Sequence, residues 1–351
     1  MHHDKPTPLV SILLATYNGE AYLEEQINSL LLQDYPNIEI IACDDASTDN
    51  TFEILLQFEK YTNFHIYRNA QNLGYIKNFE KLIELSNGDF TAFCDQDDIW
   101  HENKISALIS IAEDTGCGLV YSDAVVIDRD GNVIHSSLRK SQNIEFVDQS
   151  FQSFYFYNCV TGCTSLARKN VIINFLPFPD GIIVHDWWIA FCFARIDRIR
   201  YTHEKLIRYR LHNTNQVGIN RVSYKKIFKS FLLGIMNPTR VLKHKKHLRL
   251  WQKRYLDYFS ACMAFEKANN RDSTKTEAMI TWANNLDSSV FMHREFRFFM
   301  KTPETFSILP QNLRFIALIS RLISFKSLNL IFYCMLLLWA TALYLVISSL
   351  I

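Results

Sequence analysis

Short apolar runs alternate with amphipathic segments along the first third of this chain. The apolar runs predict buried strands at Leu9–Ala15, Ile38–Cys43, Phe64–Tyr67, Phe90–Cys94 and Leu119–Ser122. The segments between them predict helices at Tyr22–Gln33, Thr51–Glu59, Ile76–Leu85 and Lys104–Glu113. Alternation of this kind is typical of a sheet with helices on both faces. The sequence therefore predicts an α/β domain with a mostly parallel central sheet.

The pattern becomes less regular after this region. Val125–Ile134 predicts a hairpin that turns at Asp130-Gly131. Val160–Ala167 fits a strand or a helix, Trp187–Phe193 predicts a helix, and Arg200–Tyr209 predicts a strand and a loop. We expect this α/β domain to occupy residues 1–220.

Residues 221–327 differ from the first domain in charge. Many Lys and Arg residues, and no Asp or Glu, lie between Arg221 and Arg254. Tyr224–Leu233 sets apolar residues against three lysines, which suits a helix lying on an anionic membrane surface. An ordinary amphipathic helix packed on the first domain fits this segment equally well. We predict a basic, helical, membrane-associating region here.

Leu328–Ile351 contains no charged residue. As a helix it would be about 36 Å long, enough to cross the hydrocarbon core of a bilayer. Basic residues precede it at Arg314, Arg321 and Lys326, and the positive-inside rule then places the rest of the protein in the cytoplasm. We predict a terminal transmembrane helix at residues 328–351, with a buried core helix as the alternative.

Charge and cysteine content narrow the class of protein. The formal net charge of +1 gives no reason to expect a nucleic-acid partner. The eight cysteines form no CxxC pair, a pattern typical of reduced thiols in a cytosolic compartment. The first apolar run, Leu9–Ala15, is too short for a signal peptide.

Three carboxylates occur within the four residues Asp95-Gln96-Asp97-Asp98, directly after a predicted strand. Like charges this close repel one another unless a positive group lies between them. A hard divalent cation, which prefers oxygen ligands and also binds phosphate oxygens, meets this requirement. In open α/β sheets, ligands bind at the carboxyl ends of strands. The quartet therefore indicates a metal and phosphate site, although Asp98 could instead cap the following helix.

Three other polar clusters follow predicted strands. Thr16-Tyr17-Asn18 follows the first strand and offers backbone N–H groups and a ring for stacking. Asp44-Asp45 follows the second, where a carboxylate could accept hydrogen bonds from a base or a ribose. Asn72-Leu73-Gly74 forms a turn before a helix that carries Lys77. Together with the quartet, these clusters predict a nucleotide-sugar site at one edge of the sheet.

The ordered motifs resemble a family 2 glycosyltransferase with a GT-A fold, and the resemblance covers about residues 8–218. They are Thr16-Tyr17-Asn18, Asp44-Asp45-x-Ser47-x-Asp49, Asn72-x-Gly74 and Asp95-x-Asp97-Asp98. The resemblance implies that Asp44 or Asp45 reads the base of a nucleotide diphosphate sugar, that Asp95 contacts the ribose, and that Asp97 binds Mn²⁺ or Mg²⁺. The implied donor-binding residues are Thr16, Tyr17, Asn18, Asp44, Asp45, Asn72, Lys77, Asp95 and Arg210.

Two further motifs match the same family. His185-Asp186-Trp187-Trp188 resembles its catalytic-base segment, which implies that Asp186 is the general base. Tyr209-Arg210-x-His212 resembles its late diphosphate-binding segment, which implies that Arg210 clamps the diphosphate and that His212 is a metal ligand. A helix cap at Asp186 and a surface histidine at His212 remain the structural alternatives.

The resemblance implies an inverting transferase that moves a sugar from a nucleotide diphosphate to a hydroxyl of a glycan or lipid-linked acceptor. The Asp-Trp-Trp segment and Gln96 are similar to bacterial rhamnosyltransferases, which use dTDP-L-rhamnose to build surface polysaccharides. A UDP-hexose donor and a non-catalytic membrane-bound scaffold are the alternatives; a glycosidase or a nucleotidyltransferase fits the motifs less well. We expect the protein at the cytoplasmic face of the bacterial inner membrane, held by a C-terminal anchor.

Overall fold

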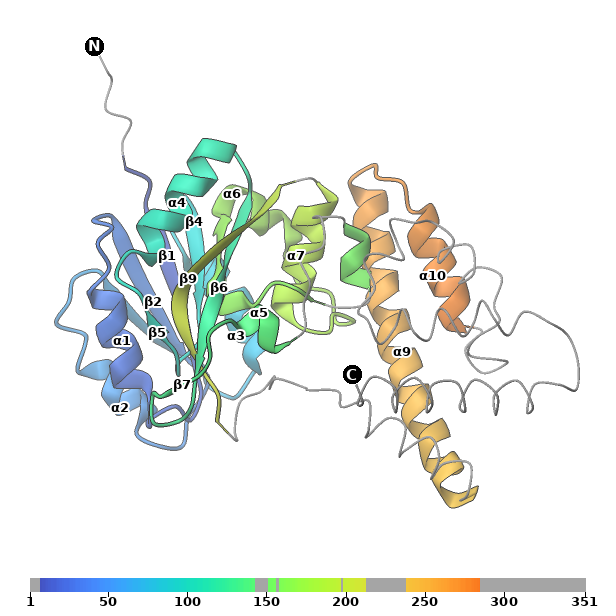
Figure 1. Ribbon diagram of the computed structural model, residues 1–351, viewed down its shortest axis with the longest axis horizontal. Coiled ribbons are helices and arrows are strands. Elements are labelled where there is room, and N and C mark those ends of the chain that lie inside the picture. The colour runs from blue at the N-terminus through green and yellow to red at the C-terminus, as the bar shows by residue number, and fades with distance from the viewer. Residues whose placement is uncertain (1–6, 143–150, 156–157, 197, 213–237, 285–351) are drawn as a thin grey trace, which may run out of the picture.

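The computed structural model describes residues 7–142, 151–155, 158–196, 198–212 and 238–284 (Figure 1). A nine-stranded sheet lies at the centre of this part of the chain, with the strand order β3-β2-β1-β4-β8-β6-β9-β5 and with β7 beside β6. The strands are β1 Val10–Thr16, β2 Ile38–Asp44, β3 Phe64–Arg68, β4 Phe90–Cys94, β5 Ile99–Trp100, β6 Leu119–Ile127, β7 Val133–His135, β8 Ser165–Arg168 and β9 Ile199–Arg210.

The first four sheet positions are parallel, as predicted. β1 pairs in parallel with both β2 and β4, so that Thr16 lies opposite Asp44 and Leu14 lies opposite Cys94. β1, β2 and β4 consist mostly of buried, apolar residues because both of their faces are covered, whereas β3, at the edge of the sheet, buries only Phe64. Since parallel strands end at the same edge, this register places the polar segments after β1, β2 and β4 side by side.

The sheet is mixed, so the prediction of a mostly parallel sheet is only partly confirmed: beyond β4, β6 and β9 still pair in parallel, but the other pairings are antiparallel. β8 runs antiparallel to both β4 and β6, β7 is antiparallel to β6, and β5 is antiparallel to β9. The chain enters β8 from the turn at Gly162–Thr164, which lies at the carboxyl end of β4. It therefore has to run back along β4. The expected hairpin at Val125–Ile134 is confirmed by the β6–β7 pairing.

Helices cover both faces of the sheet, as expected. They are α1 Leu23–Leu31, α2 Thr51–Leu56, α3 Tyr75–Leu85, α4 Lys104–Thr115, α5 Leu138–Ser141, α6 Lys169–Ile172 and α7 His185–Arg195, with short 3₁₀ turns η1 Phe151–Tyr155, η2 Gly162–Thr164 and η3 Ile173–Phe175. Leu13 and Phe93 belong to the core under α3 and α7, whereas Ile12 and Leu14 belong to the core under α1 and α4. The alternation along β1 thus divides the apolar residues between two layers.

Two further helices, α9 Pro238–Ala268 and α10 Thr274–Asn284, lie beyond α7 on the side away from the sheet (Figure 1). Tyr258 and Phe259 of α9 are buried in the same core as Trp188 of α7. A buried ion pair joins Arg195 at the end of α7 to Glu266 of α9 at 2.7 Å. The residues near the end of α9 therefore pack as an extension of the α/β core.

The described part of the region 221–327 is helical, as expected, but the predicted helix at Tyr224–Leu233 lies outside the described residues. The predicted terminal span at residues 328–351 also lies outside them. Across the part of the chain that the structure describes, none of the helices has the length and apolar character of a membrane span.

Candidate functional site

Asp44 lies at the carboxyl end of β2 and is fully buried. Its carboxylate accepts hydrogen bonds from the backbone N–H and the hydroxyl of Ser47 and lies 3.2 Å from Nε of Arg68. These contacts fold the Asp44–Asp49 segment into a tight turn. The predicted role of Asp44 in base recognition stays a prediction, and the contacts seen here hold the turn in shape.

Asp45 connects the second and third polar segments. Its carboxylate accepts hydrogen bonds from the backbone N–H groups of Leu73 and Gly74, both at 2.8 Å, and from Asn69 Nδ2 at 2.7 Å. Asn72 returns a bond from Nδ2 to the Asp45 carbonyl. The turn needs Gly74 because its φ of 80° lies in the left-handed region. The structure thus brings Asp45 and Asn72 together.

Lys77 lies in the first turn of α3, directly after this turn. Its ammonium pairs with Glu80 at 3.1 Å, and its side chain is 42% exposed. The ammonium is therefore accessible to solvent, and its predicted contact with the donor stays a prediction.

Gln96, within the acidic quartet, binds the turn after β1 through two hydrogen bonds. Its Oε1 accepts the Tyr17 N–H at 2.8 Å, and its Nε2 donates to the Tyr17 carbonyl at 3.0 Å. Asn18 adopts a left-handed conformation and donates its N–H to Ser47 Oγ at 2.9 Å. Thr16 is buried, whereas the Tyr17 ring is 40% exposed. Tyr17 is therefore partly open to solvent at the strand edge.

β5 and β9 bring the late motif to the quartet. β5 follows Asp98 directly and pairs antiparallel with β9, whose last residue is Arg210. The Arg210 N–H donates to Asp98 Oδ1 at 2.9 Å, and His212 Nε2 lies 2.7 Å from Asp97 Oδ2. The structure therefore brings Asp97 and His212 together from segments far apart in the sequence.

The Asp97–His212 pair fits a divalent cation. Two ligands that share one ion at right angles lie about 3 Å apart when each is about 2.1 Å from the metal. The 2.7 Å contact between His212 Nε2 and Asp97 Oδ2 is itself a hydrogen bond, so an ion would replace the proton that the two groups share; both side chains keep some exposure, 15% for Asp97 and 13% for His212. A carboxylate oxygen suits Mn²⁺ and Mg²⁺ alike, whereas an imidazole nitrogen favours Mn²⁺ over Mg²⁺.

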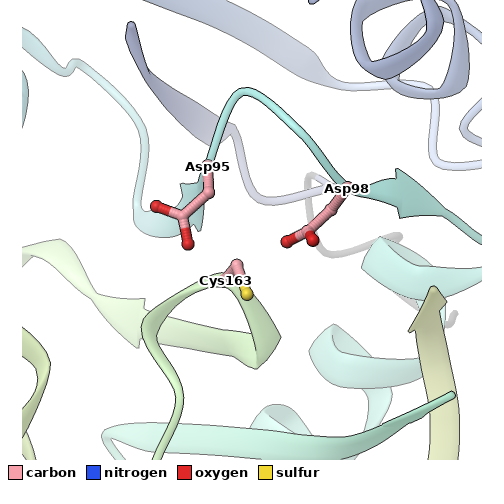
Figure 2. A group of neighbouring side chains, drawn as sticks. All are labelled: Asp95, Asp98 and Cys163. Carbon is pink, nitrogen blue, oxygen red and sulfur yellow. The ribbon is translucent and has the colours of Figure 1, made fainter. Parts of the chain in front are cut away.

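Asp95, Asp98 and Cys163 form a second acidic group (Figure 2). One potential ligand atom from each of the three residues lies within 4.8 Å of those of the others. Burial, together with the charges of Asp97 and Asp186, raises the pKa of Asp95 to about 7. A thiol is a poor ligand for a hard cation, so we favour Asp97 and His212 as the metal ligands.

Arg210 occupies a buried position between α1 and the β6–β7 hairpin. Its guanidinium donates to the carbonyls of Asp97 at 2.9 Å and Arg129 at 3.0 Å, and pairs with Glu25 at 2.5 Å. The side chain is 2% exposed and lies against the Tyr22 ring. The predicted binding of Arg210 to the diphosphate stays a prediction. It would require the guanidinium to give up some of its present hydrogen bonds.

Asp186 lies in the first turn of α7 and faces the acidic strand end. Its Oδ1 accepts a hydrogen bond from Asn158 Nδ2 at 2.9 Å, and its Oδ2 accepts the Gly162 N–H at 3.0 Å. Burial raises the pKa of Asp186 to about 6, and the backbone N–H groups limit that rise. Gly162, which donates to Asp186, precedes Cys163, whose side chain lies beside Asp95 and Asp98, so α7 brings this carboxylate toward the end of β4.

Sequence reasoning missed several residues that shape this site. Gln96 fastens two turns, Asn158 holds Asp186, and Lys104 donates to the Cys163 carbonyl from a fully buried position. The Gln96 position inside the quartet was a usable signal, but nothing in the sequence separates Asn158 or Lys104 from other polar residues. A cavity of about 500 Å³ also lies beside His212, between the start of α1 and the hairpin turn at 128–130.

Comparison with known proteins agrees with the motifs. Residues 11–176 match the family described as Glycosyl transferase family 2. The dTDP-rhamnosyl transferase RfbG of Shigella flexneri is 33% identical over 231 residues, which cover 62% of this chain and 77% of RfbG. WfgD of Escherichia coli, a UDP-Glc:alpha-D-GlcNAc-diphosphoundecaprenol beta-1,3-glucosyltransferase, is 30% identical over 171 residues, or 49% of this chain and 64% of WfgD.

A solved structure shares the fold. TarS residues 1–349 of S. aureus, in complex with UDP-GlcNAc, matches with a TM-score of 0.52 at 14% identity, over 86% of this chain and 79% of that one. The identity with RfbG over most of that protein's length, the family match and the shared fold agree with one another. The chain therefore belongs to glycosyl transferase family 2 and has an α/β fold of the GT-A type.

Proposed function

We propose that this protein is an inverting glycosyltransferase in which Asp186 is the general base. The observation that carries the proposal is the placement of one partly buried carboxylate, Asp186, opposite the acidic end of β4. In this reaction an acceptor hydroxyl oxygen forms a bond to the anomeric carbon, and the bond from that carbon to the diphosphate breaks on the opposite face. Asp186 takes the hydroxyl proton, a contribution typically worth about 10²- to 10⁴-fold in rate.

The leaving diphosphate accumulates negative charge, which the site has to offset. Asp97 and His212 would hold the Mn²⁺ or Mg²⁺ ion, which supplies Lewis-acid stabilisation of the diphosphate oxygens when bound. Tyr17 offers an exposed ring to the base, and the turns held by Asp45 and Gln96 line the same edge. These placements support a nucleotide diphosphate sugar as the donor.

The donor that we propose is dTDP-L-rhamnose. RfbG, which is 33% identical over 231 residues, is a dTDP-rhamnosyl transferase. WfgD is described with UDP-Glc and TarS with UDP-GlcNAc, so a UDP-hexose is the second candidate. Both candidates use the same chemistry at Asp186 and differ in the sugar pocket.

The acceptor that we propose is a lipid-linked glycan at the cytoplasmic face of the bacterial inner membrane, within surface polysaccharide synthesis. WfgD, by its name, acts on a diphosphoundecaprenol-linked sugar. The run from Arg221 to Arg254 without an acidic residue would favour an anionic membrane surface, at about 1 kcal/mol for each basic side chain near it. The apolar segment Leu328–Ile351 would add an anchor.

The test is a donor panel of dTDP-L-rhamnose, UDP-glucose and UDP-GlcNAc with membrane-extracted lipid-linked acceptors, with Mn²⁺ or with EDTA. We expect transfer from dTDP-L-rhamnose, dependent on the metal and on the acceptor, and none from Asp186→Asn at equal donor affinity. Release of nucleoside diphosphate without an acceptor at the same rate would indicate hydrolysis instead. Full transfer by Asp186→Asn would remove Asp186 from the role of base.

A further inference from the structure

Lys104, the first residue of α4, is fully buried although it carries an ammonium group. Its Nζ donates to the Cys163 carbonyl at 2.6 Å and lies 3.0 Å from the centre of the Trp100 ring. Lysine is almost never fully buried without partners, because taking its charge out of water is costly. A carbonyl and an aromatic face partly offset that cost. The position of this side chain is therefore closely determined.

The Cys163 carbonyl belongs to the 3₁₀ turn η2, and Cys163 is the residue that faces Asp95 and Asp98 (Figure 2). Burial lowers the pKa of Lys104 to about 7, while the neighbouring thiols and the carboxylates of Asp98 and Asp95 act against that change. Lys104 thus binds η2 from the buried side of the turn, close to the acidic end of β4.

The same turn also holds the proposed base. The Gly162 N–H donates to Asp186 Oδ2 at 3.0 Å, one residue before the carbonyl that Lys104 binds. Ser165 Oγ closes the turn by donating to the Gly162 carbonyl at 2.7 Å. A Cβ atom added at Gly162 would lie 3.2 Å from His185 Nε2 and 3.4 Å from the Asp186 Cβ. The turn therefore packs against the start of α7 with little room to shift.

We propose that Lys104 is a positioning residue for the general base: it fixes the Gly162–Thr164 turn, and the turn fixes Asp186 through the Gly162 N–H. The inference rests on the proposed role of Asp186. Because Lys104 is fully buried and donates to the Cys163 carbonyl, it would act on the base only through the turn. The other ionisable groups near Asp186 in the described residues include Asp95 from β4, Tyr75 from α3 and His185 from α7 itself.

The test is Lys104→Met in the full chain, because methionine has a similar volume and no donor. We expect kcat for transfer to fall at least about tenfold, since a small misplacement of a catalytic group is costly. The pH midpoint of kcat/KM should rise by about one unit, because the Gly162 N–H would no longer stabilise the ionised carboxylate as well. Binding of the nucleoside diphosphate of the best donor should change less than about threefold.

Lys169→Met is the matched control. The Lys169 ammonium also donates inward, to the Ser86 carbonyl at 3.0 Å and the Ser86 hydroxyl at 2.7 Å, but close to the start of β4 and thus at the end opposite the acids. We expect this variant to melt at a lower temperature with an unchanged pH midpoint. A Lys104→Met variant that behaves in the same way would reduce Lys104 to a purely structural role and overturn the proposal.

Lys104→Gln covers the case in which Lys104→Met does not fold, because it removes the buried charge and keeps an amide donor. We expect its pH midpoint to lie between those of the wild type and of a variant without a donor, with a smaller loss of kcat. An unchanged midpoint and a kcat within about threefold of the wild type would overturn the proposal. If Asp186→Asn retains full transfer, the proposed function fails instead, whatever the Lys104 variants do.

Discussion

Asp186 combines burial, which disfavours its charge, with hydrogen bonds that favour it. Burial prevails, because the pKa of its carboxyl rises to about 6. A general base works only when it is ionised. We therefore expect kcat/KM for transfer to rise with pH and to reach half its plateau near pH 6. Steady-state rates between pH 5 and 8, with nucleotide binding measured at each pH, check this, and a flat profile over that range would contradict it.

The same raised pKa predicts a stability cost. The Asp186 carboxyl keeps its proton to a higher pH in the folded state than in the unfolded chain. The contribution of this group to the free energy of unfolding is therefore fully present below about pH 4 and is lost as the pH rises through about 6. Asp186→Asn removes the charge, so it should stabilise the fold by about 1–2 kcal/mol at pH 7.5, allowing for partial exposure of the side chain.

Chemical denaturation at pH 7.5 and at pH 4, both in EDTA, measures this difference. The gain from Asp186→Asn should disappear at pH 4. Asp180→Asn, at an exposed position before α7, serves as the matched control and should show little change at either pH. A variant that is less stable than the wild type at pH 7.5 would show that the hydrogen bonds to Asn158 and Gly162 outweigh the cost of the charge.

The proposed donor site consists of turns rather than strands, and Gln96 joins two of these turns. Its two hydrogen bonds to the backbone of Tyr17 would each contribute about 1 kcal/mol. Gln96→Ala should therefore raise the donor KM by about tenfold while the acceptor KM stays the same. Gln57→Ala, at an exposed position after α2, is the control and should leave both constants unchanged. An equal rise in the KM values for donor and acceptor would mean that Gln96 stabilises the whole site and not only the donor side.

The planar guanidinium of Arg210 makes hydrogen bonds to α1, to the acidic quartet and to the β6–β7 hairpin. Lysine cannot reproduce that fork of donors, so Arg210→Lys should destabilise the fold by about 2–4 kcal/mol. Thermal melts with and without Mn²⁺ and dTDP would measure it. If the fold is barely affected and nucleotide affinity falls by more than about tenfold, Arg210 acts on the diphosphate, as the sequence predicts, rather than as a tie between elements.

At the scale of the whole molecule, the buried parallel strands β1, β2 and β4 could be predicted, and the antiparallel pairings of β8 could not. Phe90–Cys94 has the same bounds in the sequence and in the structure because a strand covered on both faces is an uninterrupted apolar run. Val160–Ala167 mixes apolar residues with Thr, Gly and Ser, and its composition does not say that the turn at η2 sends the chain back along β4. Contacts such as Lys104 to Cys163 depend on three-dimensional packing between distant elements, which no local pattern encodes.

The packing of α9 on α7 indicates that the stable catalytic domain extends beyond residue 220. Glu266 is fully buried, and its partner Arg195 lies at the end of the helix that carries Asp186. Removing one member of such a pair costs about 3–5 kcal/mol, because the other charge stays buried. A fragment of residues 1–220 loses Glu266 together with the aromatic side chains of α9. We therefore expect it to be insoluble or to melt well below a fragment of residues 1–284, which keeps both helices.

Circular dichroism melts and limited proteolysis of the two fragments measure this difference. Arg195→Met in the longer fragment isolates the ion pair, since it should lower stability by about 3 kcal/mol while the apolar contacts of α9 remain. The double variant Arg195→Met, Glu266→Met should recover part of the loss, because neither charge is then buried alone. If residues 1–220 melt cooperatively at the temperature of the longer fragment, the catalytic domain ends where the sequence places it, and α9 is an accessory that the base does not need.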